Sequence, residues 1–268
     1  MPARLLNAAT YGGLNLHPSL LPDLRGPAPL HHALLQRREF TGVSLQTMHP
    51  TTFDAGVVLA RSQEPGVRVR EGATPGHLLE TLGPLGAEML VRGIEEGVFV
   101  PPLNEVVGST FPSKGSRGEA SLAHAPKIQP QDRKVDWAKW TADEIVLRDR
   151  VLGRLWGLEE GMELREGSLV RAVFTGPWRV EDLPEKASRQ AGMPFIHPSS
   201  KAGREVIGFA TCDTKAVVPS GITFDGGGKD RGARHLSELL EQKAMLGISR
   251  KCGRTDKIMY LYNGTTIS

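Results

Sequence analysis

The chain has 268 residues, 39% of them hydrophobic and 24% charged, and a formal net charge of +3. This composition predicts a globular protein with one large domain or two ordinary ones. The sequence has no run of 18 apolar residues, which argues against a membrane-spanning helix. Its two cysteines, Cys212 and Cys252, lie too far apart for a disulfide framework or a metal motif, which predicts a reducing compartment.

The first hundred residues contain alternating helix and strand patterns. Gly12-Gly13 ends the first helical pattern, and residues 41–48 alternate as a strand does. Thr74-Pro75 is typical of a helix start, because threonine caps a helix and proline suits its first turn. Gly83-Pro84 can kink that helix. In chain order we expect a helix over 4–11, a strand over 14–17, a helix over 27–38, strands over 41–48 and 57–60, and a helix over 75–97.

A change in composition divides the chain. Glycine, serine and proline become frequent, which predicts a linker between domains. Beyond it we expect a helix opened by a capping-box pattern at Thr141–Glu144, several short strands between glycine and proline turns, and a last helix over 235–246. The predicted organisation is a domain over 1–103, a linker over 104–120, a domain over 121–246 and an unassigned tail over 247–268.

The stretch Leu14–Gly26, with the sequence LNLHPSLLPDLRG, combines polar side chains with a restricted backbone. Asn15 and His17 share one face of the predicted strand, because side chains repeat every second residue. Pro18 and Pro22 then limit the backbone that follows. An amide and an imidazole side by side can donate hydrogen bonds to a substrate, although such a pair by itself is more often packed or solvated.

The string Asn-x-His-Pro-Ser-Leu-Leu-Pro, followed by Arg-Gly and a proline-led helix, resembles the signature of the folate-dependent formyltransferases. The resemblance implies an α/β fold, with a partial Rossmann-like domain that carries three catalytic residues, Asn15, His17 and Asp54. Asp54 lies in an Asp-x-Gly turn, where aspartate is commonly structural. It nevertheless follows the strand over 41–48 in the place where the family has its essential aspartate. The loop His49–Phe53 departs from the acidic, glycine-containing loop of many bacterial members.

The resemblance also implies a reaction, in which a formyl group passes from 10-formyltetrahydrofolate to an amine without a metal. Asn15 and a protonated His17 can donate to the oxyanion that develops, and Asp54 can orient the His17 ring. Which group carries the proton is left open. Arg25 is expected either at an anionic part of the substrate or paired with a carboxylate. The residues expected at the mouth of the folate and substrate pocket are Ser19, Leu20, Leu21, Pro22, Arg25 and Gly26.

The second half of the chain resembles the C-terminal domain of the family members that act on methionyl-tRNA. The resemblance rests on Ala125–Ile128 and Val135–Trp137, and it implies an OB-like β-barrel, a fold suited to nucleic acid. We expect Lys127 and Arg133 nearest to the RNA, with ordinary solvated side chains as the alternative. Trp137 is expected to be a packing residue.

Together these resemblances imply formyl transfer to the amino group of methionyl initiator tRNA by a monomer without membrane contact. Family members begin with further strand–helix units, so we expect a chain that lacks part of its sheet and is poorly stable alone. Asn7–Gly13 and His49–Phe53 look closer to mitochondrial members, which implies the mitochondrial matrix, or the cytoplasm for a bacterial protein. The alternatives are a formyltransferase for another amine, such as an amino sugar, and an inactive RNA-binding fragment.

Overall fold

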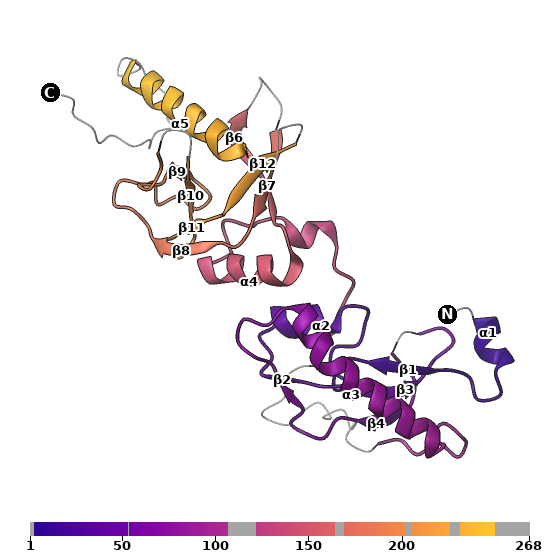
Figure 1. The fold of residues 1–268 in the computed structure, drawn as a ribbon. Helices are drawn as coiled ribbons and strands as arrows, with labels where there is room; N and C mark the ends of the chain where they lie inside the picture. Colours follow the sequence, from indigo (N-terminus) through magenta and orange to yellow (C-terminus); the bar gives the residue numbers. More distant parts are fainter. Residues whose placement is uncertain are drawn as a thin grey trace, which may run out of the picture. The chain divides into compact units, whose positions relative to one another are not determined.

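The chain forms two units, residues 1–128 and residues 129–268 (Figure 1). The computed structural model describes residues 3–52, 54–106, 122–163, 169–201, 205–225 and 231–249. Most of the predicted linker and of the predicted tail lies outside the described residues, and the predicted domain bounds therefore stay predictions. Each unit is described by itself below.

The three-stranded sheet of the first unit is antiparallel, with the strand order β1-β3-β4. Asn15 lies opposite Gln46 in the register of β1 and β3, so their side chains share a face of the sheet. The predicted strand over 14–17 is confirmed. The three strands are β1 (Leu14–His17), β3 (Ser44–Thr47) and β4 (Val58–Arg61).

The prediction of a single strand over 41–48 is wrong, because the chain passes from one sheet to another within this stretch. Its start belongs to β2 (Phe40–Thr41), which pairs with β5 (Val67–Arg68), and its end belongs to β3. Between them, the backbone N–H of Val43 donates to the hydroxyl of Ser62 at 3.0 Å, and the Val43 carbonyl accepts from the Ser62 N–H at 2.9 Å. A serine side chain therefore replaces a strand partner at this point, which the alternation of side chains cannot reveal.

A long helix, α3, crosses one face of this sheet (Figure 1). Thr74 caps it by accepting from the His77 N–H at 3.2 Å, and the helix continues through Pro84. At Gly93 a β-carbon would lie 2.6 Å from the Leu45 side chain, so the glycine permits close packing of helix on sheet. The helices of this unit are α1 (Ala3–Ala8), α2 (Pro29–Leu35) and α3 (Pro75–Glu95), and all three end earlier than predicted.

The second unit contains two antiparallel sheets, in the orders β8-β11-β10-β9 and β12-β7-β6. The Thr141 hydroxyl accepts from the Glu144 N–H at 3.2 Å, as the capping pattern predicts. The elements are η1 (Pro130–Arg133), α4 (Ala142–Leu152), β6 (Trp156–Glu163), β7 (Leu169–Thr175), β8 (Arg179–Asp182), β9 (Pro194–Ile196), β10 (Ile207–Ala210), β11 (Lys215–Val218), β12 (Gly221–Phe224) and α5 (Gly232–Ser249).

An aromatic core holds this unit together. Phe174 and Phe209 are fully buried and their rings lie 5.3 Å apart, while Trp137 stacks on Phe209 at 5.2 Å. Trp137 is therefore a packing residue, as predicted. The described part of the chain shows mixed helices and antiparallel sheets, with neither a closed barrel nor a parallel sheet in it. Among its helices, none is long and apolar enough to cross a membrane.

Candidate active site

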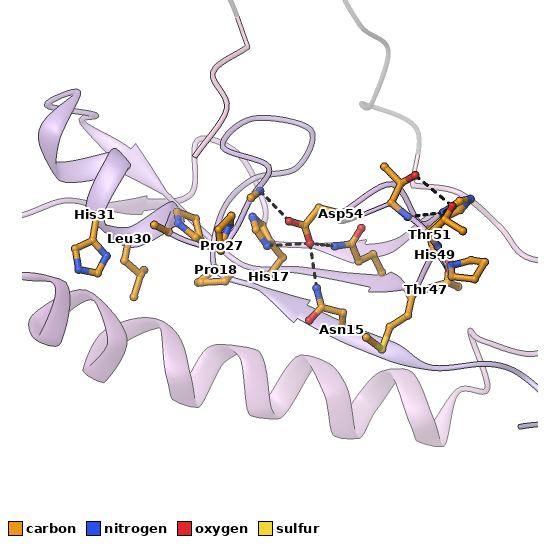
Figure 2. Close-up of a pocket in the computed structure, with 17 residues that line it drawn as sticks. Asn15, His17, Pro18, Pro27, Leu30, His31, Thr47, His49, Thr51 and Asp54 are labelled. Atoms are coloured by element: carbon orange, nitrogen blue, oxygen red, sulfur yellow. Dashed lines mark hydrogen bonds and ion pairs between the residues drawn. The ribbon is translucent and has the colours of Figure 1, made fainter. Parts of the chain in front are cut away.

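A cavity of about 450 Å³ lies in the first unit, and the three predicted catalytic residues line it together. Asn15 and His17 come from β1, and Asp54 comes from the turn between β3 and β4. Figure 2 shows the dashed contacts of their side chains converging on Asp54. Residues 39 positions apart in the sequence are thus brought to one point by the pairing of β1 with β3.

The Asp54 carboxylate is the centre of this cluster. Its Oδ1 atom accepts from Asn15 Nδ2 at 3.3 Å and from Gln46 Nε2 at 2.9 Å. Its Oδ2 atom accepts from the backbone N–H of Gly26 at 2.8 Å. His17 Nδ1 lies 3.4 Å from Oδ1 and forms an ion pair with it when the ring is protonated. The two side-chain amides and the backbone N–H are donors, and Nδ1 is a donor too when the ring is protonated, which suits an ionised carboxylate.

These partners lower the pKa of Asp54. Burial by itself would raise it, but the hydrogen bond and charge of His17, followed by the donors Gly26 and Gln46, outweigh burial. Asp54 also has a φ of +51°, a left-handed conformation that aspartate tolerates better than most residues. The carboxylate therefore stays charged at neutral pH and holds its donors in place.

His17 is almost fully buried, with 4% of its surface exposed, and both ring nitrogens face acceptors. Nε2 lies 2.9 Å from the carbonyl oxygen of Leu24. A carbonyl can only accept, so Nε2 carries a hydrogen in this arrangement. In the neutral ring the nitrogen without a hydrogen is consequently Nδ1, next to the Asp54 carboxylate.

Sequence reasoning missed Gln46, whose side chain is 1% exposed and lines the cavity. Its amide donates to Asp54, and among the described residues its Oε1 atom has no hydrogen-bond partner. The sequence signal that could have identified Gln46 is the alternation of side chains along the strand, which places Gln46 on the same face as Ser44, two residues earlier. That signal becomes useful only once the register places Gln46 opposite Asn15.

The loop after β1 contributes its backbone more than its side chains. Of the six loop residues predicted at the pocket mouth, Gly26 lines the cavity. The other five do not belong to its lining, namely Ser19, Leu20, Leu21, Pro22 and Arg25. Ser19 and Leu21 are buried, and the Ser19 carbonyl accepts from the Ser44 hydroxyl at 2.8 Å. The predicted contacts of this loop with substrate stay predictions.

Two further residues were predicted near RNA. Lys127 is exposed at the end of the first unit, and Arg133 is exposed in η1 of the second. The Nε atom of Arg133 donates to the carbonyl of Leu152 at 2.8 Å, which holds its guanidinium against the end of α4. Among the described residues there is no group of three or more metal-binding side chains.

Known proteins resemble this chain over both units. Residues 1–94 match the formyl transferase family model. The mitochondrial methionyl-tRNA formyltransferase of Saccharomyces cerevisiae is 31% identical over 284 aligned residues, covering 97% of this chain and 65% of the yeast protein. The methionyl-tRNA formyltransferase of Bacillus thuringiensis is 32% identical over 192 residues, covering 72% of this chain and 54% of the bacterial protein. A solved structure, a HypX variant from Aquifex aeolicus, covers 85% of this chain and 35% of its own, with a TM-score of 0.47 and 18% identity.

The chain thus spans 65% and 54% of the lengths of these two curated relatives. The family match includes every residue that lines the cavity. It also includes β1, β3 and β4, which position the cluster. Residues 1–94 are thus similar to the formyl transferase family over the part of the chain that carries the site.

Proposed function

We propose that this chain transfers the formyl group of 10-formyltetrahydrofolate to the amino group of methionyl initiator tRNA. The observation that carries the proposal is the cluster of Asn15, His17 and Asp54 at one cavity. Both curated relatives described above carry the name methionyl-tRNA formyltransferase, which supports this substrate over other amines.

The donor set of the cavity suits a carbonyl-bearing ligand. A volume of about 450 Å³ lies within the usual range of small-molecule pockets. When bound, the folate supplies the formyl carbonyl, whose oxygen becomes negative as an amine attacks. Asn15 Nδ2 has two hydrogens, and one faces Asp54. Its second hydrogen is the one we assign to the formyl oxygen, where a placed donor is worth several kcal/mol.

Asp54 and His17 have different roles in the proposed proton transfer. Asp54 has a lowered pKa, which makes it a weak base and suits it to holding Asn15 and His17 in place. His17 must keep the hydrogen on Nε2 because that atom faces the Leu24 carbonyl. We therefore assign the proton that leaves the attacking amine to Nδ1 of His17, beside the Asp54 carboxylate. The same proton then passes to the departing folate nitrogen as its bond to the formyl carbon breaks.

For the RNA substrate, we propose that the second unit is an OB-like domain and that Lys127 and Arg133 contact the tRNA. Both residues are exposed, and the two short antiparallel sheets are of the kind that such a domain contains. We further propose a monomer with the partial Rossmann-like domain over 1–103. The yeast relative is mitochondrial, which supports the mitochondrial matrix, whereas the Bacillus relative supports the cytoplasm for a bacterial protein.

The test is formylation of charged initiator tRNA by the purified full chain with 10-formyltetrahydrofolate. Asn15→Ala, His17→Ala and Asp54→Ala should each lower the activity by about 100-fold or more, whereas replacement of Asn7, an exposed asparagine of α1, by alanine should retain it. Formylation of a nucleotide-linked amino sugar in place of the tRNA would overturn the proposed substrate. A chain with no affinity for 10-formyltetrahydrofolate would overturn the proposed enzyme and favour an RNA-binding fragment.

A further inference from the structure

Residues 123–126, called the pairing segment below, belong to the first unit and precede the second unit in sequence. Their backbone pairs with a loop about 100 residues earlier, residues 23–28. The Leu24 N–H donates to the Ala123 carbonyl at 2.8 Å, and the Ala125 N–H donates to the Arg25 carbonyl at 2.7 Å. The Ala123 N–H also donates to Asp23 Oδ1 at 2.9 Å.

The contact is closely packed as well as hydrogen-bonded. Ala125 is completely buried, in a cluster with Leu24 and Ala33. At Gly26, where φ is +125°, a β-carbon would lie 2.3 Å from the Ala125 carbonyl oxygen. Any side chain at Gly26 would therefore push the pairing segment away, which gives a physical reason for glycine there.

Two loop residues that contact the pairing segment, Leu24 and Gly26, also form hydrogen bonds with the proposed catalytic residues His17 and Asp54. Leu24 donates its N–H to Ala123 and offers its carbonyl to His17 Nε2 at 2.9 Å. Its φ of +58° is unfavourable for leucine, so the conformation must be held by its surroundings. Gly26 rests against Ala125 and donates its N–H to Asp54 at 2.8 Å.

We propose that the pairing segment is a positioning element of the active site, which sets His17 and Asp54 through Leu24 and Gly26. The proposal rests on the function proposed above. Its consequence is that catalytic geometry depends on the stretch of chain that leads into the second unit, since Gln129 follows only a few residues later. Loosening this segment should lower turnover more than it lowers folate binding.

Asp23 allows a graded test, because its Oδ1 atom accepts from both Ala123 and Arg38, the latter at 3.2 Å. Asp23→Ala removes both bonds, Asp23→Asn keeps an oxygen for Ala123, and Arg38→Met removes only the ion pair. Ala125→Pro is the stronger change, since it deletes the N–H that donates to Arg25.

The readouts are kcat and KM for formyl transfer, and the ¹⁵N NMR resonances of the His17 ring in the ligand-free full chain. We expect Ala125→Pro to shift the His17 resonances and lower kcat by about 100-fold, with KM for the folate within about threefold, because small misplacements of reacting groups are costly. Asp23→Ala should shift the His17 resonances and lower kcat in the same direction, by a smaller factor. Asp23→Asn and Arg38→Met should behave like the unchanged protein.

Unchanged His17 resonances and kcat in folded Ala125→Pro protein would overturn the proposal, as would equal effects of Asp23→Ala and Arg38→Met. Tryptophan fluorescence reports the folding of the second unit, which holds all four tryptophans, and amide exchange in β3 reports the first. If the unchanged chain formylates no amine, the proposed function fails, but the His17 resonances still decide whether the segment positions the ring.

Discussion

Replacing Asp54 by alanine tests whether one carboxylate holds the cluster together. Four groups lose their partner in Asp54→Ala, namely Asn15, His17, Gln46 and the N–H of Gly26. A buried donor left unsatisfied typically costs about 1–3 kcal/mol. Water entering through the cavity can satisfy some of them, so the cost falls on the least accessible groups.

The expected loss in the free energy of unfolding follows from burial and backbone geometry. Gln46 and the Gly26 N–H are buried, and at the low end of that range they contribute about 2 kcal/mol. Alanine tolerates the left-handed φ of +51° at position 54 less well than aspartate, which adds about 1 kcal/mol. We therefore expect the free energy of unfolding of the first unit to fall by about 3 kcal/mol.

Amide hydrogen exchange in β3 measures this loss, because a change of 3 kcal/mol corresponds to a roughly 100-fold lower protection factor. The pH dependence provides an internal check. The pKa of Asp54 is lowered in the folded state, so its stabilisation is present above the pKa of the unfolded chain and is lost as pH falls through the folded-state pKa. The difference between the unchanged chain and the variant should be full at pH 7 and shrink below about pH 4.

A matched control is Glu88→Ala, in the same unit. The Glu88 side chain is 65% exposed and forms an ion pair with Arg92 at the surface. We expect a change below about 0.5 kcal/mol for it. Protection in Asp54→Ala equal to that in the Glu88 variant would refute the reasoning. A loss that stays constant down to pH 3 would equally show that the Asp54 charge is not its source.

Three further changes test the site and the second core. Asn15→Ala should lower kcat by about 100-fold in a single-turnover formylation assay with little change in folate binding, because an oxyanion donor acts on the transition state; an unchanged kcat would remove Asn15 from that role. Gln46→Glu places a second carboxylate 2.9 Å from Asp54, which raises the pKa of Asp54 and should move the acid limb of the pH–rate profile to higher pH. A profile like that of the unchanged chain would contradict the part assigned to Gln46. Phe209→Ala should destabilise the second unit by about 3–5 kcal/mol, measured by tryptophan fluorescence in urea, whereas Val180→Ala, at a residue 38% exposed, should change it by less than about 0.5 kcal/mol.

Part of the site could be predicted because it depends on local periodicity. Asn15 and His17 point the same way on any strand, since the side-chain repeat is two residues. Thr74 and Thr141 cap their helices through bonds to residues three positions on, which a pattern can also predict. Asp54 was located through resemblance to a family, and its position in a turn would not have singled it out.

The groups that complete the site have no local signature. The Leu24 carbonyl and the Gly26 N–H are backbone groups, and nearly every residue of any sequence has the same groups. Gln46 becomes a partner of Asp54 only through the register of β1 on β3. A shift of that register by one residue would turn Gln46 to the other face of the sheet.

By itself, the sequence determined which stretches favour helix or strand and which polar side chains share a strand face, because these depend on neighbouring residues. Only the tertiary structure decided that the stretch over 41–48 serves two sheets and that residues 123–126 pair with the loop beside His17. Both arrangements depend on pairing between segments that lie far apart in the sequence. Their stability depends on hydrogen bonds and packing that exist only after the chain has folded, so no pattern in either segment alone reveals them.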